Sequence, residues 1–323
     1  MIRYIFKRII MVLPVLLGIS LLIFTMLYFT PGDPTSMLLP IDTPPALREA
    51  YRAHLGLDQP FWVQYGNYLK GIVTRFDFGI SWITHQSASV ELLQKFPYSL
   101  TLAFWAAAIA TVLGIIAGII SAVKQYTVFD SLTSLLGLMA YSMPNFWLGM
   151  LLILLFSLHL RWLPPSGVSS WVGWILPSLT IGLSSMASVM RMTRSSMLEV
   201  IRQDYIITAR AKGLSEYPVI GKHALGNAFI PILTTIGLTF GRTMGGAIVT
   251  EQVFSIPGIG KLIVDSINMR NYPMVQGVVL LCAMWFCLVN LAIDIIYAFI
   301  DPRIRAQYVR RKIKAVAGKE TAK

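Results

Sequence analysis

The chain has 323 residues, of which 55% are hydrophobic and only 13% are charged, and its formal net charge is +12. Soluble domains are about a quarter charged, so this composition excludes an ordinary soluble domain. Stretches of roughly twenty uncharged residues, long enough to cross a hydrocarbon core of about 30 Å, indicate a polytopic α-helical membrane protein. Strands of a membrane barrel would instead show short alternating segments.

Hydropathy predicts six membrane spans along the chain. In chain order they are 9–30, 98–122, 132–158, 174–190, 228–249 and 275–300. The first is expected to stay uncleaved, because its apolar run is too long for a signal peptide and no cleavage site follows. The fourth is rich in Ser and Gly, which favours a helix buried among the others. Pro144 is expected to kink the third span.

Basic residues predict the orientation of these spans. An even number of spans puts both termini on one side, and with the termini inside, the inner segments hold 18 of the 27 Lys and Arg residues against eight outside. Cytoplasmic segments carry the excess of Lys and Arg in membrane proteins. The termini and the segment 191–227 are therefore predicted to face the cytoplasm, and 31–97 to form a small outer region. The positive charge thus indicates topology rather than nucleic-acid binding.

No catalytic or metal-binding constellation is found in the sequence. The four histidines are scattered, and the two cysteines, five residues apart, do not share a helical face. The stretch "PGIGKL" at 257–262 lacks both the first Gly and the Ser or Thr of a phosphate-binding loop. The chain is therefore not expected to bind nucleotide itself.

Polar residues within or beside spans suggest a pathway or a gate. Arg242 lies deep in span five, and two interpretations are equally weighted. In the first it is structural, as a partner for Glu251 or Asp265 or by extending outward to the interface; in the second it is a cation lining a polar pathway. Ser142 and Asn145 supply polar groups beside the kink at 144. A structural contact near the cytoplasmic interface is favoured for Asp294. Asp130 is expected to lie at a helix N-terminus, where the helix dipole favours its negative charge.

Between spans five and six the chain is expected to turn and then form a short helix. Pro257, Gly258 and Gly260 turn it, and Leu262 begins a segment with one apolar face. This helix should lie against the outer mouth of the bundle. An interfacial anchor and an extracytoplasmic gate both fit it.

The charged segment between spans four and five is predicted to be a helix–turn–helix. Gly213 after Lys212 is typical of a helix C-terminus, and Ser215 is suited to cap the next helix. Apolar residues then recur as a stripe on that helix: Val219, Ile220, Ala224, Leu225 and Ala228. An apolar stripe on an exposed element predicts that something packs against it.

This loop resembles the E-A-A-x-x-x-G loop of permease subunits of bacterial ABC importers. Ala209 and Gly213 stand in the positions of that motif, whereas Ile207 and Thr208 replace its Glu and first Ala. A longer pattern is similar to the dipeptide/oligopeptide/nickel branch of these permeases over essentially the whole chain. It includes "KRIIMVLPVLLGISLLIFTMLYFTPGDP", "YSMPNFWLGM", "HALGNAFIPILTTIGL" and "EQVFSIPGIGKLIVDSI". The chain is most like the first of the two permeases in such systems.

The resemblance implies an all-α membrane protein with six transmembrane helices in the type I ABC importer permease fold. It implies a bacterial inner-membrane complex with a second homologous permease, two ATPases and an extracytoplasmic binding protein. ATP and Mg²⁺ would bind to the ATPases, and this chain would hold no cofactor. The residues expected to contact an ATPase are Asp204, Ala209, Arg210, Lys212, Gly213, Leu214 and Ser215. The candidates for a pathway or gate are Ser142, Asn145, Arg242, Pro257, Gly258 and Gly260.

These expectations divide the chain into four parts. They are the first span with its N-terminal tail (1–30), the outer segment (31–97), the permease core (98–303) and a basic cytoplasmic tail (304–323). Import of short peptides is the leading prediction, and import of nickel or a metal chelate is the alternative. A secondary transporter acting alone is less favoured, because it would predict inverted repeats or mid-membrane carboxylates.

Overall fold

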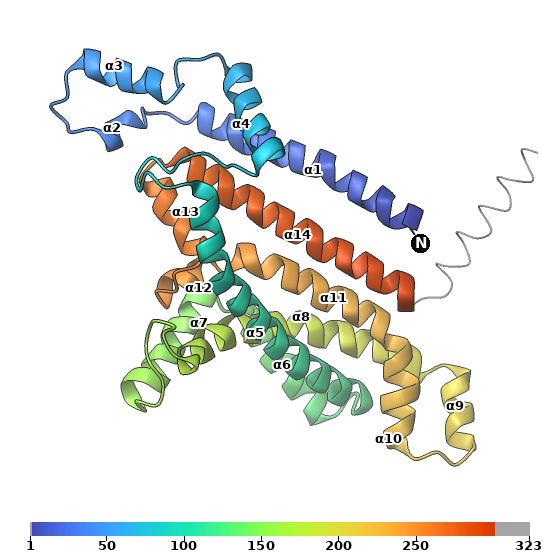
Figure 1. The fold of residues 1–323 in the computed structure, drawn as a ribbon. Helices are drawn as coiled ribbons and strands as arrows, with labels where there is room; N and C mark the ends of the chain where they lie inside the picture. The colour runs from blue at the N-terminus through green and yellow to red at the C-terminus, as the bar shows by residue number, and fades with distance from the viewer. Residues whose placement is uncertain (1, 301–323) are drawn as a thin grey trace, which may run out of the picture.

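The computed structural model of the chain describes residues 2–300, so the predicted tail 304–323 lies outside the described residues. Five long helices cross the length of the molecule (Figure 1). They are α1 (Ile2–Tyr28), α5 (Ala88–Val123), α8 (Ile175–Ile201), α11 (Leu225–Gly246) and α14 (Tyr272–Ile300). Each contains a stretch long and apolar enough to cross a membrane. Five of the six predicted spans are therefore confirmed as single helices.

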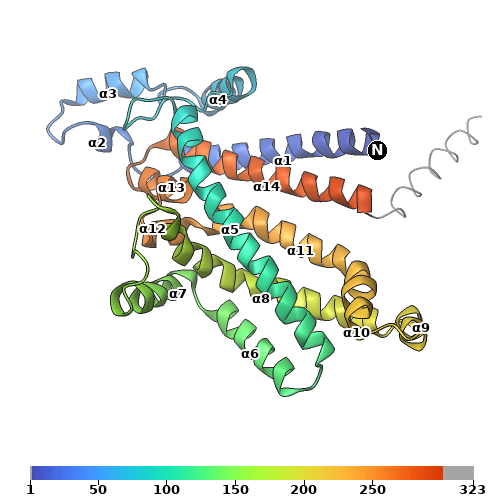
Figure 2. The same ribbon diagram turned by 60° about the horizontal axis from the view of Figure 1, so that its bottom comes forward.

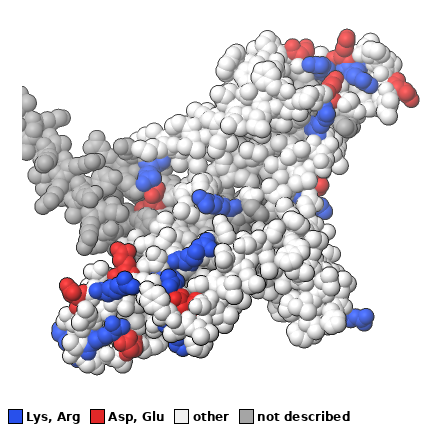
Figure 3. Space-filling view, turned by 180° about the vertical axis from the view of Figure 1, so that it is seen from behind, with Lys and Arg blue, Asp and Glu red and all other residues white. Residues whose placement is uncertain are grey.

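Shorter helices cluster at the ends of these five. At one end lie α2 (Thr35–Leu38), α3 (Pro45–His54), α4 (Phe61–Arg75), α12 (Ile248–Val253) and α13 (Ile259–Asn268). At the opposite end lie α9 (Asp204–Ala211), α10 (Glu216–Pro218) and the π-helical turn η3 (Val219–Ala224). Figures 1 and 2 both place α2–α4 and α9–α10 at opposite ends of the long helices. In Figure 3 the charged side chains gather at these two ends, with a mostly uncharged band between them.

The third predicted span is wrong as a single helix. The chain forms α6 (Val128–Ser142), then α7 (Asn145–Leu152) with the π-helical η1 (Ile153–His159), and the two parts bend by 105°. Pro144 causes the break, because it lacks an N–H and forces the preceding residue out of the helical region. Met143 is accordingly extended, with φ −77° and ψ 127°. The predicted kink is confirmed, as a bend of 105° between the two parts.

The long helix α8 is the best buried of the candidate spans, as its Ser and Gly content predicted. Half of its apolar window is buried, against 11% for α1. Its closest neighbour is α5, and glycines allow the contact: a Cβ on Gly118 would lie 2.5 Å from the Cβ of Thr193. Small residues let helix backbones approach closely within a membrane, where packing rather than burial from water drives association.

At its other edge the bundle is closed by α1 and α14. Arg8 and Asp294 form an ion pair of 2.8 Å between these helices, so the structural interpretation of Asp294 is confirmed. Nearer the end that carries α4, Phe24 of α1 stacks among aromatic rings of α4, with its ring centroid 5.3 Å from those of Phe61 and Tyr65. The segment 31–97 is thereby fixed to the first helix.

The helix α5 begins ten residues before the predicted span. Residues 88–97 include Glu91 and Lys95, which lower the hydropathy there although the backbone is already helical. Ser87, in an extended conformation, precedes the first turn. The helix therefore extends out of the apolar core into the segment 31–97.

Candidate functional site

The segment between α8 and α11 forms the predicted helix–turn–helix. The helix α9 ends at Ala211, and Gly213 adopts φ +81°, a left-handed conformation that glycine adopts without strain. The N–H of Gly213 donates to the carbonyl of Arg210 at 2.9 Å, and that of Leu214 to the carbonyl of Ala209 at 3.4 Å. These two bonds form a Schellman motif, which satisfies carbonyls that the helix end would leave free. The predicted glycine break is confirmed.

An ion pair closes the turn from the outside. The Nε and Nη2 of Arg210 donate to the two carboxylate oxygens of Glu216 at 2.8 and 3.1 Å. These hydrogen bonds raise the pKa of Arg210, whose positive charge is therefore maintained. Both side chains are exposed, so the pair contributes little to stability and mainly fixes the geometry of the turn.

The predicted cap at Ser215 is wrong in its chemistry. Ser215 does occupy the N-cap position of α10, but its side chain makes no capping hydrogen bond. Only its backbone carbonyl takes part, by accepting the N–H of Val219 at 3.4 Å. The bidentate contact between Arg210 and Glu216 joins the two helices around this turn instead.

The apolar stripe on the second helix is covered by the chain itself. Val219 and Ala224 are fully buried in a cluster that also contains Met197 of α8, together with Ile206 and Ala209 of α9. The sequence therefore predicted correctly that something packs against this face, and α8 and α9 of the same chain do so. Ala209, taken as a contact residue, points into the same cluster and is only 8% exposed.

The opposite face of this element is open. Six of the seven residues predicted to contact an ATPase are exposed there: Asp204, Arg210, Lys212, Gly213, Leu214 and Ser215. Ile207, which replaces the Glu of the motif, is exposed beside them, and sequence reasoning missed two further exposed apolar residues, Tyr205 and Tyr217. Tyr217 is 90% exposed, an unusual position for a large ring. The sequence could have revealed them, because their helical positions do not coincide with the face that carries the buried residues of the same helices.

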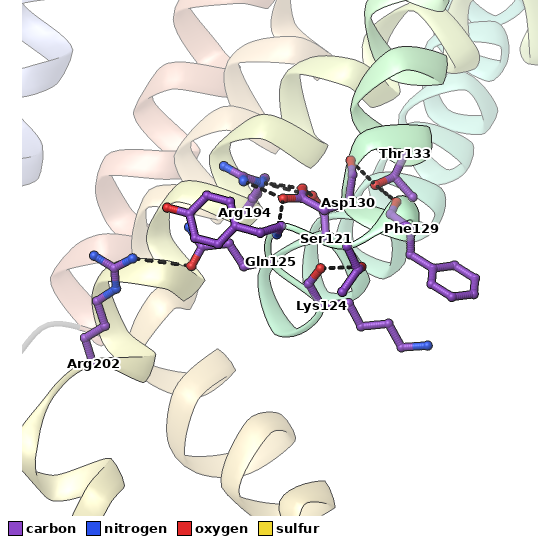
Figure 4. A network of polar contacts seen from close by, with 10 residues as sticks. Ser121, Lys124, Gln125, Phe129, Asp130, Thr133, Arg194 and Arg202 are labelled. Carbon is purple, nitrogen blue, oxygen red and sulfur yellow. Dashed lines mark hydrogen bonds and ion pairs between the residues drawn. The ribbon is translucent and has the colours of Figure 1, made fainter.

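A polar cluster joins the base of this element to α5 and α6 (Figure 4). Arg194 of α8 donates from Nε and Nη2 to the two oxygens of Asp130 at 2.9 Å each, and Ser121 of α5 donates to the same carboxylate. About two turns further on, just after the last residue of α8, Arg202 donates to Gln125 at 3.3 Å. Asp130 does lie in the first turn of α6, as predicted, but sequence reasoning missed its partner Arg194.

The second candidate region, around Pro257, Gly258 and Gly260, encloses a buried carboxylate. Glu251 is fully buried, and it accepts hydrogen bonds from the hydroxyl of Ser99 and from the N–H of Lys261 at 3.0 Å. Because Lys261 lies in the first turn of α13, the carboxylate satisfies a free N–H at the positive end of that helix. A Cβ on Gly258 would lie 2.3 Å from Oε2 of Glu251, so only glycine fits beside the carboxylate.

We expect Gly258→Ala to destabilise the protein by about 1–3 kcal/mol, as overpacking of a filled site does. The added methyl group would displace Glu251 from its hydrogen bonds or push α13 away from α12. The thermal unfolding midpoint of the purified protein measures this effect. Gly66→Ala, at a helical glycine with no atom within 4 Å of its Cβ position, is the matched control. Equal midpoints for the two variants would contradict the proposed steric contact.

The remaining pathway candidates lie on different elements. Ser142 is exposed and Asn145 half-buried, on the two sides of the break between α6 and α7. Arg242 is exposed on α11, and among the described residues it forms no ion pair with Glu251 or Asp265, so the predicted ion pair is wrong. The side chain of Glu251 is committed to Ser99 and α13 instead. The described structure does not bring Ser142, Arg242 and the 257–260 turn together into one site.

Long apolar helices that carry one charged helix–turn–helix at one end agree with a permease of the type I ABC importer class. The chain belongs to the family described as the inner membrane component of binding-protein-dependent transport systems, whose model matches residues 110–306. A model for the N-terminal part of such components matches residues 1–103. The protein is thus an ABC importer permease of the peptide/nickel type.

Relatives with known names agree with this assignment. The chain is 42% identical over 305 residues to the glutathione transport system permease protein GsiC of Escherichia coli strain K12. The aligned residues cover 94% of this chain and 99% of that protein. The GsiC of Shigella dysenteriae serotype 1 strain Sd197 matches equally. Among solved structures, the inward-facing MetNI methionine ABC transporter matches with a TM-score of 0.55 at 18% identity, over 65% of this chain and 96% of that one. That likeness concerns the fold.

Proposed function

We propose that this permease imports short peptides as part of an ATP-driven complex. The complex contains a second, homologous permease, two ATPase subunits that bind ATP and Mg²⁺, and an extracytoplasmic binding protein. This chain holds no cofactor and catalyses no reaction. The name of the similar protein GsiC supports the substrate class, since glutathione is a short peptide. The observation that carries the proposal is the exposed face of α9 and the turn after it, which is held rigid from within.

The exposed face of α9 and its turn is the contact for an ATPase in this proposal. Leu214 and Tyr217 offer apolar surface, and Lys212 and Asp204 offer charge around it. An interface of this kind has an apolar centre and a polar rim. Arg210, Gly213 and Ser215 support this contact with the ATPase because they shape the turn. Ala209 supports it from inside, because it packs into the buried cluster beneath the turn.

Movement of the ATPases can reach the membrane helices through this element. The helix α9 follows α8 directly, and η3 continues into α11 without a break. Because the inner faces of α8, α9 and η3 share one buried cluster, a push on the turn displaces them together. This is a rearrangement of packed elements between two discrete states, as alternating access requires. The element lies in the cytoplasm in this proposal, as do both termini, while 31–97 lies outside.

We further propose that Arg242 and the break at Ser142 and Asn145 line the pathway, and that the turn at Pro257, Gly258 and Gly260 belongs to an outer gate. A lone arginine exposed on a membrane helix is costly unless it faces water or a partner. A second permease beside α11 would supply a water-filled path of that kind. Its guanidinium would attract the carboxylate of a peptide.

Arg242→Ala is expected to raise the KM for peptide uptake about tenfold while the complex still assembles, because a charge-assisted hydrogen bond is lost. Uptake into proteoliposomes and co-purification of the subunits measure the two effects. Arg75→Ala, which removes an exposed arginine at the end of α4, away from the pathway candidates and the helix–turn–helix, is the control. An unchanged KM in Arg242→Ala would return this residue to a structural role.

The substrate class is tested by uptake with the cognate binding protein. Proteoliposomes containing the complete complex receive radiolabelled trialanine in one arm and ⁶³Ni²⁺, with and without a chelator such as histidine, in the other. ATP-dependent accumulation of trialanine alone supports peptide import. Accumulation of nickel without trialanine would replace the peptide assignment by the metal alternative. Accumulation without ATP would contradict the whole scheme.

A further inference from the structure

The extracytoplasmic end of the permease contains a cavity of about 790 Å³. Its walls come from the end of α1, the segment after it, α3, the start of α4 and the start of α14. The volume lies within the range of about 300–1,000 Å³ that is usual for small-molecule sites. Nothing in the proposed pathway uses this cavity, which lies between the segment 31–97 and the bundle.

Two opposite charges line the cavity without neutralising each other. Asp33 and Arg52 both face it, yet no ion pair joins them in the part of the chain that the structure describes. Asp33 receives a hydrogen bond from the N–H of Thr35 at 3.0 Å. Burial opposes its ionisation, but the hydrogen bond from the N–H of Thr35 and the charges of Arg52 and Arg48 outweigh it and lower the pKa of Asp33. A carboxylate and a guanidinium are therefore both available to a ligand.

The wall formed by α14 offers polar groups that have no partner. Tyr272 lines the cavity, and its buried hydroxyl makes no hydrogen bond among the described residues. Gln276, one helical turn further on, is only 8% exposed, and its side-chain amide makes no hydrogen bond within the same part of the chain. Buried polar groups are normally satisfied, so the unpaired hydroxyl of Tyr272, beside the unbonded amide of Gln276, indicates a missing ligand or water.

This wall is held in place before any ligand arrives. Asn271, at the start of α14, donates to Ser81 at 2.8 Å and accepts the N–H of Trp82 at 3.1 Å. Asn271 and Ser81 are both buried, and the ring of Trp82 lies 5.3 Å from that of Tyr272. The contacts join residues far apart in the sequence. A preorganised wall loses little entropy on binding.

We propose that this cavity is an outer binding site for short zwitterionic peptides, an inference that rests on the proposed function. Asp33 binds the terminal ammonium group and Arg52 the terminal carboxylate. Tyr272 and Gln276 hydrogen-bond to the peptide groups between them, and the ring of Trp82 contacts a side chain. The site would hold substrate at the outer surface of the permease before it enters the pathway. We call it the outer peptide site.

The test measures binding of radiolabelled trialanine to the complete complex in phosphatidylglycerol nanodiscs, without the binding protein. We expect saturable binding that weakens about tenfold in Asp33→Asn and in Arg52→Gln, because each change removes a charge-assisted hydrogen bond. Acetyl-trialanine lacks the ammonium group and should bind wild type and Asp33→Asn equally. Trialanine amide lacks the carboxylate and should bind wild type and Arg52→Gln equally.

Two charges of the same region serve as matched controls. Asp58→Asn and Arg75→Gln alter exposed residues that do not line the cavity, and they should leave trialanine binding unchanged. Absence of saturable binding, or equal binding by wild type and both cavity variants, would overturn the outer peptide site. A site that accepts trialanine only until phosphatidylethanolamine is added would belong to a zwitterionic lipid headgroup, which also overturns the peptide assignment.

Uptake experiments separate this proposal from the proposed function. If the wild-type complex with its binding protein fails to import trialanine, peptide import itself fails. If it imports trialanine while binding without the binding protein is insensitive to Asp33 and Arg52, only the outer peptide site is rejected. Normal uptake together with charge-dependent binding supports both.

Discussion

Gly213→Trp is expected to leave the permease folded in the membrane and to lower substrate-stimulated ATP hydrolysis by about 30-fold, the loss that follows from removing an interface contact worth about 2 kcal/mol. Gly213 lies at the tip of the turn after α9, with no atom within 4 Å of its Cβ position. An indole there projects outward and would hold an ATPase away from Leu214. The folding cost is limited to the left-handed backbone, which costs a non-glycine residue about 1–2 kcal/mol.

Two variants separate bulk from backbone strain. Gly213→Ala introduces the strain without the indole, and it should retain most of the ATPase stimulation. Gly66→Trp adds the same indole at an equally open glycine of α4, at the opposite end of the molecule, and should have no effect on ATP hydrolysis. Normal substrate-stimulated hydrolysis in Gly213→Trp would remove this turn from the contact with the ATPase.

Arg194→Ala is expected to produce the largest loss of stability, about 2–4 kcal/mol, because it leaves the buried carboxylate of Asp130 without its ion-pair partner. Asp130 is 8% exposed and would keep only the hydrogen bonds from Ser121 and from the N–H of Tyr126. Since Arg194 joins α8 to α6 (Figure 4), the loss should also loosen the base of the helix–turn–helix. Thermal unfolding in detergent should show a midpoint lower by about 5 °C or more.

A double variant distinguishes a lost ion pair from general damage. Asp130→Leu combined with Arg194→Met replaces both charges by apolar groups of similar size. Such replacements of buried pairs are often neutral or stabilising, so the double variant should recover most of the lost stability. Arg191→Ala, which removes a nearby exposed arginine of α8, should change the midpoint little. A double variant as unstable as Arg194→Ala would contradict the ion-pair explanation.

The parts that the sequence predicted correctly follow from local chemistry. An apolar run of sufficient length is a helix in a membrane because every backbone group must be satisfied within it. Pro144 breaks a helix through its own ring, and Gly213 ends one through its own φ, whatever surrounds them. Even the burial of α8 was visible, because Ser and Gly permit close helix contact.

The errors concern which elements meet. The apolar stripe that begins at Val219 indicates that one face of a helix is buried, but its periodicity does not predict which element covers that face. In the structure, α8 and α9 cover it. The same holds for charges. Asp130 and Arg194 are 64 residues apart, and Ser99 and Glu251 are 152 apart. No local pattern connects such pairs.

The sequence by itself therefore determined the class of the protein, the number of apolar segments and the position of the exposed turn. Only the tertiary structure decided that Ala209 points inward while Tyr217 points outward, that Glu251 holds α13 rather than Arg242, and that Asp33 and Arg52 face one cavity. The physical reason is that secondary structure depends on neighbours along the chain. Partners, cavities and unpaired charges arise where helices distant in the sequence pack together, and that depends on the shape of every side chain between them.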